Sequence, residues 1–167
     1  MALLNVLQFP NPRLRLKAEP VDQVTPEILT ILDNMLETMY ADRGVGLAAT
    51  QVNIQKRLLV MDVSDSYNEP LCFINPEIIS VEGEKIYEEG CLSVPGIYEK
   101  VKRGAKVIFK YRDRDGKSHT VEAEDLLANC IQHEIDHLNG ILFIDHLSPL
   151  KQNRAIKKLE KLERRRL

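Results

Sequence analysis

The residues Gln132-His133-Glu134-Ile135-Asp136-His137 are the most informative stretch of this sequence. When H-E-x-x-H lies on a helix, its two histidines are one turn apart and can bind one metal ion. Glu134 is then rotated by about 100° around the helix axis, so that it can reach a water on the metal without binding the metal itself. Five-residue matches also arise by chance, so the rest of the chain has to supply further evidence for a metal site.

A helix is predicted around this motif. The run from Ala123 to Ile131 is rich in Leu, Ala and Ile. Glu124 and Asp125 near its start favour a helix N-terminus, where the helix dipole is positive. Gly140 is typical of the residue just past a helix end. We therefore expect one helix that carries both histidines and ends just before Gly140.

The composition favours one domain in a reducing compartment. The chain has 167 residues, 44% of them hydrophobic, and we expect a single domain over residues 1–167. Its formal net charge of −2 argues against general or sequence-specific nucleic-acid binding. The spacing of Cys72, Cys91 and Cys130 suggests no disulfide framework, which favours a cytoplasmic protein. A signal peptide and a run of ~20 apolar residues are both missing from the sequence, so neither secretion nor membrane insertion is expected.

Strand signals precede the metal-binding helix. An earlier helix is predicted from Pro26 to Tyr40, with Thr25 as its N-cap. Asp113-Arg114-Asp115-Gly116 is typical of a hairpin turn. Strands are predicted at residues 57–63, 71–74, 78–81, 85–88, 106–111 and 117–122. This order predicts an α+β domain, in which mostly antiparallel sheets pack around the central metal-binding helix and a further helix lies at the C-terminus.

A catalytic zinc-type site has three protein ligands and an open position for water, so the two histidines need a third partner. In the extended motif H-E-x-x-H-x-x-G-x-x-H, the last position is Phe143, which cannot bind a metal. His146 and Glu160 remain alternatives, although the first is more typical of a surface histidine and the second of a helical ion pair. Cys91 is favoured, because Glu89-Gly90-Cys91-Leu92-Ser93-Val94-Pro95 places a thiol in a turn after a predicted strand.

A second unusual stretch is Gly44-Val45-Gly46-Leu47-Ala48-Ala49-Thr50-Gln51. It matches the dinucleotide fingerprint G-x-G-x-x-G/A, with Asp62 at a suitable distance downstream. The match is weak, because a helix rather than a strand leads into it. The glycines can instead let the backbone approach a ligand closely, and Gln51 offers an amide donor to an oxyanion.

Three stretches together resemble the signature motifs of the bacterial peptide deformylases, namely residues 44–51, 89–93 and 132–137. The resemblance extends to Phe9-Pro10, to the turn at residues 113–116 and to Leu147-Ser148-Pro149-Leu150-Lys151 before the last helix. It therefore covers nearly the whole chain. The single-domain type with a helical C-terminus fits best.

The resemblance implies a hydrolase that removes the formyl group from the N-terminal formyl-methionine of newly synthesised polypeptides and releases formate. It implies one divalent metal ion held by Cys91, His133 and His137, with Fe²⁺ as the native ion. The chemistry of the donors alone leaves the metal open, because one thiolate and two imidazoles also suit Zn²⁺, Ni²⁺ and Co²⁺.

In the mechanism that the resemblance implies, metal-bound water attacks the formyl carbon. Glu134 accepts the proton of this water and then protonates the leaving amine. The oxyanion would be stabilised by the metal, by the side chain of Gln51 and by the backbone N–H of Leu92.

The resemblance also implies how substrate is held. Gly44, Val45 and Gly46 would run beside the substrate backbone like an added strand. Glu89 and Arg103 would form an ion pair behind the metal loop and orient it. The residues that would line the methionine pocket are Val45, Tyr87, Leu126, Cys130 and His133. Asn129 departs from the aliphatic residue expected at its position, so either the pocket is more polar or Asn129 turns away from it.

Residues 148–167 predict a strongly basic C-terminal helix. Its cationic residues are Lys151, Arg154, Lys157, Lys158, Lys161, Arg164, Arg165 and Arg166. The charge pattern alone is equally compatible with a solvated helix and with one that binds RNA phosphates. The resemblance implies docking on the ribosome near the exit tunnel, by a protein that we expect to be a monomer.

Two other functions stay open from the residues alone. One is a small zinc endopeptidase that uses His133 and His137 with Glu160 or His146, in which Cys91 would be incidental. The other is a non-catalytic ribosome-associated module with a structural metal. The second fits less well, because closed structural sites have four protein ligands and only three are identified.

Overall fold

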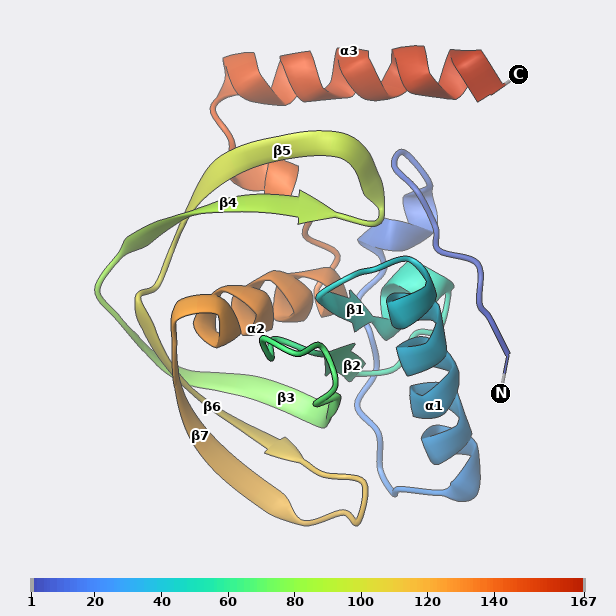
Figure 1. Cartoon of the computed structure of the whole chain (residues 1–167), viewed down its shortest axis with the longest axis vertical. Coiled ribbons are helices and arrows are strands. Elements are labelled where there is room, and N and C mark those ends of the chain that lie inside the picture. Colours follow the sequence, from blue (N-terminus) through green and yellow to red (C-terminus); the bar gives the residue numbers. More distant parts are fainter. Residues whose placement is uncertain (1, 167) are drawn as a thin grey trace.

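A computed structural model describes residues 2–166 and shows a central helix enclosed by strands (Figure 1). The helices are α1 (Pro26–Ala41), α2 (Asp125–Leu138) and α3 (Pro149–Arg166). The strands are β1 (Gly46–Ala48), β2 (Leu58–Met61), β3 (Leu71–Glu82), β4 (Lys85–Cys91), β5 (Val94–Arg103), β6 (Lys106–Arg112) and β7 (Ser118–Glu124). Short 3₁₀ turns lie at Pro12–Arg15, Ala49–Val52 and Phe143–His146.

The strands form two antiparallel sheets on opposite sides of α2. The larger has the order β1-β2-β3-β6-β7, and β4 pairs with β5 in a separate hairpin. In Figure 1, α2 lies between this hairpin and the larger sheet, and α3 crosses above β5. The predicted α+β class, with a central helix and a C-terminal helix, is therefore confirmed.

The helix α2 is buried over consecutive residues rather than along one stripe. All residues from Ala128 to Ile135 are buried. Its apolar side chains pack against the larger sheet, where Ala128, Ile131 and Leu138 share a core with Phe73 and Phe109. A helix is buried on all sides only when it lies inside the protein. Its polar side chains therefore face the hairpin and the cavity described below.

The other helices were largely anticipated. Thr25 caps α1 as predicted, since its side chain accepts a hydrogen bond from the backbone N–H of Ile28. Met35 and Met39 of α1 are fully buried in a second core against β1 and β2. Helix α3 follows Ser148, and its Ala155 and Leu159 pack on a third core next to β5. Leu167, the last residue of the predicted basic helix, lies outside the described residues.

The two strands predicted around Pro76 are one continuous strand, β3. The ladder between β3 and β6 shifts register between Ile74 and Glu77, so Pro76 lies in an irregularity where its missing N–H is not needed. Asn75 has a φ of 52°, and its side chain bonds to both the N–H and the carbonyl of Val21 at 2.8 and 2.7 Å. These bonds stabilise the irregularity.

Two strands were not predicted, and one boundary was wrong. β1 has only three residues, and β5 begins with a Val-Pro-Gly sequence that is typical of a loop. Ala123 belongs to β7 rather than to the helix, because its side chain lies in the core of the larger sheet. The predicted hairpin between β6 and β7 is confirmed by the hydrogen bond from Asp113 N to Lys117 O at 2.9 Å.

Within residues 2–166, none of the helices combines the length and the apolar character that a membrane span requires.

We expect Gly140→Ala to destabilise the protein strongly. Gly140 ends α2 with a φ of +78°, and an added Cβ would lie 2.4 Å from the carbonyl oxygen of Arg15. Gly116 has a similar φ of +83°, but its nearest neighbour would be 3.9 Å away. Gly116→Ala should therefore lower the free energy of unfolding in urea by about 1–2 kcal/mol, and Gly140→Ala by about 3 kcal/mol or more. If both variants lost the same free energy of unfolding, the close contact with Arg15 would not contribute to the effect of Gly140→Ala.

Candidate metal centre and active site

One cysteine and two histidines converge where the hairpin β4–β5 meets α2. Cys91 ends β4, and His133 and His137 lie one turn apart on α2. One ligand atom from each lies within 4.8 Å of the others, and Cys91 Sγ is 3.2 Å from His137 Nε2. Ligands of a tetrahedral zinc-type site are separated by about 3.3–3.8 Å, so small adjustments suffice to bind an ion.

The hydrogen bonds fix which histidine nitrogen can bind a metal. His133 Nδ1 lies 2.8 Å from Glu89 Oε1, which leaves Nε2 as the ligand atom. His137 directs Nε2 at Cys91, while its Nδ1 is buried and has no hydrogen-bond partner among residues 2–166. Burial, together with the nearby His133, lowers the pKa of His137 well below its usual value. A neutral imidazole is the form that binds a metal.

The electrostatic surroundings of His133 favour positive charge. Burial lowers the pKa of His133, but Glu134, Cys91 and Glu89 raise it by more, so that it lies well above its usual value. The cation that these groups stabilise can be a proton or a metal ion. The donor set and its surroundings therefore fit a divalent metal.

The structure distinguishes between the candidates for the third metal ligand. Among the described residues, Cys91, His133 and His137 form the one cluster of His, Cys, Asp or Glu with metal-ligand spacing. His146 instead lies 2.9 Å from Asp136, beside Arg103. Glu160 is an exposed residue of α3. The geometry thus favours Cys91 over both alternatives.

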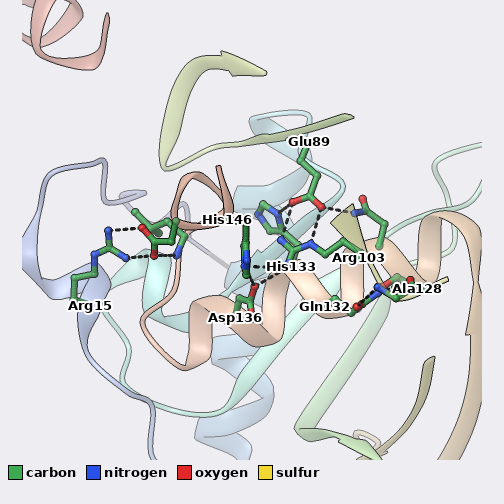
Figure 2. A network of polar contacts seen from close by, with 12 residues as sticks. Arg15, Glu89, Arg103, Ala128, Gln132, His133, Asp136 and His146 are labelled. Atoms are coloured by element: carbon green, nitrogen blue, oxygen red, sulfur yellow. Dashed lines mark hydrogen bonds and ion pairs between the residues drawn. The ribbon is translucent and has the colours of Figure 1, made fainter. Parts of the chain in front are cut away.

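The predicted ion pair between Glu89 and Arg103 is present and deeply buried. Arg103 donates from Nε and Nη2 to the two carboxylate oxygens of Glu89, at 2.8 and 2.9 Å. Figure 2 shows Glu89 between Arg103 and His133. Burial alone would raise the pKa of Glu89, but the hydrogen bonds from Arg103 and His133 outweigh it and lower this pKa to about 2. Glu89 is therefore ionised and fixes the ring of His133.

Two residues that were not predicted to belong to the site hold Arg103 and the neighbouring Gly104 in place. Its Nη1 donates to Asp136 at 2.6 Å, in the x-x part of H-E-x-x-H. Gln132 bonds to both the N–H and the carbonyl of Gly104, at 2.9 and 3.0 Å, and so holds the end of β5 against α2. Sequence spacing could place Gln132 and Asp136 on the helix, but it could not show that they face β5.

Asn129 does not turn away from the site. Its Nδ2 donates to Glu89 Oε2 at 2.6 Å, and the residue is 7% exposed. Glu89 thus takes part in four polar contacts, two with Arg103 and one each with Asn129 and His133.

Glu134 lies beside the cluster with one oxygen available. Its Oε1 is buried and has no hydrogen-bond partner among residues 2–166. A Cβ added to Gly46 would lie 2.6 Å from Oε2, so this glycine leaves the room that the carboxyl group occupies. Burial raises the pKa of Glu134 to about 7. A carboxyl group with this pKa can both accept and donate a proton near neutral pH.

Gln51 is held rigidly next to Cys91. Its Oε1 accepts from the backbone N–H of Ala48 at 2.9 Å. Its Nε2 donates to Ser93 Oγ at 3.0 Å and faces Cys91 Sγ at 3.5 Å. Leu92 and Ser93 form the two-residue turn between β4 and β5. Sequence reasoning identified Gln51 and Leu92 but missed Ser93, which contacts Gln51 only through the fold.

A cavity of about 590 Å³ opens next to these groups. Its lining includes Gln51, Cys91, Leu92, His133 and Glu134, and also the predicted substrate residues Gly44, Val45, Gly46, Leu126 and Cys130. Tyr87, which was also predicted, is not among the lining residues that the structure describes. Tyr98, Pro95 and Asn129 contribute to the wall, and the first two belong to the strand β5 that was not predicted.

The dinucleotide fingerprint has no structural counterpart. Helix α1 leads into Gly44, and a 3₁₀ turn rather than an α-helix follows β1. The downstream Asp62 is buried and accepts hydrogen bonds from Tyr40 and Ser64. The glycines instead form one edge of the cavity.

The fold and the site define an α+β protein in which an H-E-x-x-H helix meets a cysteine beside a substrate-sized cavity, an arrangement typical of mononuclear metal-dependent hydrolases. The family model "Polypeptide deformylase" matches residues 3–153. The chain therefore belongs to the polypeptide deformylase family and is an enzyme of that family.

The sequences of named relatives match this chain over nearly its whole length. The chain is 58% identical over 165 residues to a peptide deformylase of Stutzerimonas stutzeri, covering 98% of each sequence. It is 57% identical over 161 residues to "Peptide deformylase 1" of Shewanella oneidensis, covering 96% of each.

Solved structures show the same fold. A crystal structure of a peptide deformylase from Legionella pneumophila has a TM-score of 0.93 at 48% identity, covering 98% of this chain and 97% of that chain. A peptide deformylase from Ehrlichia chaffeensis in complex with actinonin has a TM-score of 0.93 at 41% identity, covering 98% of this chain and 99% of that chain.

We expect Arg103→Lys to weaken metal binding about 10- to 100-fold, because a lysine cannot hold both oxygens of Glu89 and His133 then loses its fixed orientation. Arg15→Lys is a matched control. Arg15 makes a similar two-point contact to Asp145, but this pair lies on the surface. The Co²⁺ dissociation constant, measured by competition with a chelator, checks the difference. Equal affinities in the two variants would contradict the role of the buried pair.

Proposed function

We propose that this enzyme removes the formyl group from the N-terminal formyl-methionine of newly synthesised polypeptides, using one divalent metal ion held by Cys91, His133 and His137. The observation that carries this proposal is the convergence of these three ligands beside a cavity, with an unpaired oxygen of Glu134 next to them. The native ion is proposed to be Fe²⁺, and the same donors suit Zn²⁺, Ni²⁺ and Co²⁺. When bound, the ion supplies Lewis acidity, which lowers the pKa of a water and polarises the formyl oxygen.

Glu134 is the proposed proton carrier. Its pKa of about 7, raised by burial, lets its Oε1 accept a proton from the attacking water and return it to the leaving amine. The other oxygen, Oε2, occupies the space that a Cβ at position 46 would need, so Gly46 makes room for the carboxyl group.

Gln51 and Leu92 are proposed to stabilise the negative charge that develops on the formyl oxygen. The amide of Gln51 is already fixed by Ala48 and Ser93, so little reorganisation is needed during the reaction. The backbone N–H of Leu92 lies in the tight turn directly after Cys91. Each such donor is worth about 10²–10³ in rate in comparable sites.

The peptide is proposed to bind along β1. This strand lies at the edge of the larger sheet. The carbonyl of Val45 accepts from the N–H of Asp62 at 2.8 Å and so faces β2. Because backbone groups alternate along a strand, Gly46 presents its polar groups to the free edge, where an extended peptide can pair with them. The side chain of the formylated residue would then enter the cavity between Val45, Leu126 and Cys130.

The basic helix α3 is proposed to dock on ribosomal RNA as a part of the monomeric enzyme. Ala155 and Leu159 are buried against the body of the protein, which leaves the cationic residues on the outer face. The exposed ones are Arg154, Lys157, Lys158, Lys161, Arg164 and Arg165. Lys158 also donates to the carbonyl of Gly96, a cavity residue, at 2.9 Å. Charges on one face of a fixed helix suit attraction to phosphates.

Formate release from formyl-Met-Ala under anaerobic Fe²⁺ tests the reaction. The wild-type enzyme should release formate and leave the internal bond of an unformylated peptide intact. Cys91→Ser should lose both metal and activity, because one of only three ligands is weakened. Glu134→Gln should retain the metal but lose about 10²–10⁴ in kcat, because the proton carrier is gone.

Glu122→Gln serves as the control, since Glu122 is exposed and pairs with Lys106 on the surface. Cleavage of the internal peptide bond without formate release would favour an endopeptidase. Full metal content and turnover in Cys91→Ser would remove the third ligand.

We expect the triple variant Arg154→Gln, Lys157→Gln and Lys161→Gln to lose ribosome binding in low salt but to keep normal turnover on formyl-Met-Ala. Co-sedimentation with ribosomes measures the binding. The control changes three exposed lysines outside α3 to Gln, namely Lys17, Lys56 and Lys117. The docking proposal would be wrong if both triple variants bound equally well.

A further inference from the structure

The amide of Asn129 can adopt only one orientation. Glu89 is an ionised carboxylate, because it accepts two hydrogen bonds from Arg103. It can therefore only accept, and the atom of Asn129 that lies 2.6 Å from it must be the donor, Nδ2. Turning the amide over would place Oδ1 against the carboxylate. The carbonyl oxygen Oδ1 is thus held on the side away from Glu89.

This oxygen is accessible, and the residue that carries it lines the cavity. Among residues 2–166, no donor bonds to Asn129 Oδ1, and the atom is not fully enclosed by protein. Asn129 is only 7% exposed and lines the cavity, so its remaining accessible surface lies there. It is three residues from Leu126, next to Cys130 and one turn before His133, on the part of α2 that faces the cavity.

We propose that Asn129 determines side-chain specificity by giving the substrate pocket a fixed hydrogen-bond acceptor. The pocket would then accept a formylated residue whose side chain carries an N–H donor at the position of the methionine methyl group. Glutamine has this shape and this donor. The proposal rests on the proposed function, because it assigns the cavity to the side chain of the formylated residue.

The physical reason is the cost of an unpaired acceptor. A methionine or norleucine side chain in the pocket displaces water from Asn129 Oδ1 and offers it no N–H in return. A glutamine side chain can replace the lost hydrogen bond. One hydrogen bond of ordinary strength changes a ratio of specificity constants by about three- to tenfold.

The test compares formyl-Gln-Ala-Ser with formyl-norleucyl-Ala-Ser in the metal-loaded wild type and in Asn129→Leu. Leucine has nearly the same size but no acceptor. The ratio of kcat/KM for the Gln peptide to that for the norleucine peptide should fall about three- to tenfold in the variant. Any change in metal binding caused by the lost contact to Glu89 affects both peptides alike and cancels in this ratio.

Asp125→Asn is the control on the same helix. Asp125 pairs with Lys85, its side chain is 79% exposed and it is not a cavity residue. This variant should keep the wild-type ratio. If Asn129→Leu does not fold, Asn129→Ala replaces it, because it only removes atoms. An unchanged ratio in the folded Asn129 variant, or an equal fall in the control, would overturn the proposal.

Failure of the proposed function is recognised separately. If the wild type releases no formate from formyl-Met-Ala-Ser, the ratio of dissociation constants for Gln-Ala-Ser and norleucyl-Ala-Ser, measured by calorimetry, replaces the kinetic ratio. Tighter relative binding of Gln-Ala-Ser to the wild type than to Asn129→Leu would support the acceptor. Equal relative binding would overturn it.

Discussion

The ion pair between Glu89 and Arg103 lies within the hairpin of β4 and β5, and both of its members bond to α2. Glu89 lies on β4, Arg103 ends β5, and the histidine that Glu89 orients lies on α2. A buried ion pair is stable only when its remaining hydrogen-bonding capacity is satisfied. Here Asn129 and His133 satisfy the remaining hydrogen-bonding capacity of Glu89. Asp136 and His146 lie against Arg103. The arrangement of hairpin and helix is therefore specified by polar contacts as well as by apolar packing.

This constraint explains why the site forms only in the folded chain. Cys91 comes from the hairpin, the histidines from the central helix, and Gln51 from the 3₁₀ turn after β1. Each segment packs in a different core cluster, and the polar groups meet where these clusters adjoin. The burial of this junction also accounts for the shifted pKa values of Glu134 and His137.

Local signals in the sequence were sufficient for most of the regular elements. The Thr25 cap and the periodic Met residues predicted α1, and the Asp-Gly turn predicted the hairpin of β6 and β7. The metal-ligand set followed from H-E-x-x-H and the resemblance to a family. β5 was missed because Pro95 and Gly96 resemble a loop, and only pairing with β4 reveals a strand. Tyr98, on this strand, could not be identified as a site residue for the same reason, and Ser93 contacts Gln51 only through the fold. The partners of Asn129 were equally inaccessible, since they depend on a contact across 40 residues.

Gly46 occupies the place where β1 passes the carboxyl group of Glu134, and no side chain fits between them. The backbone that would recognise the peptide and the group that would move the proton are thus in direct contact. A substitution that reshaped β1 at Gly46 would therefore also displace the carboxyl group of Glu134. Natural variation of this enzyme is therefore expected to adjust substrate preference at cavity residues outside β1, such as Leu126 and Tyr98.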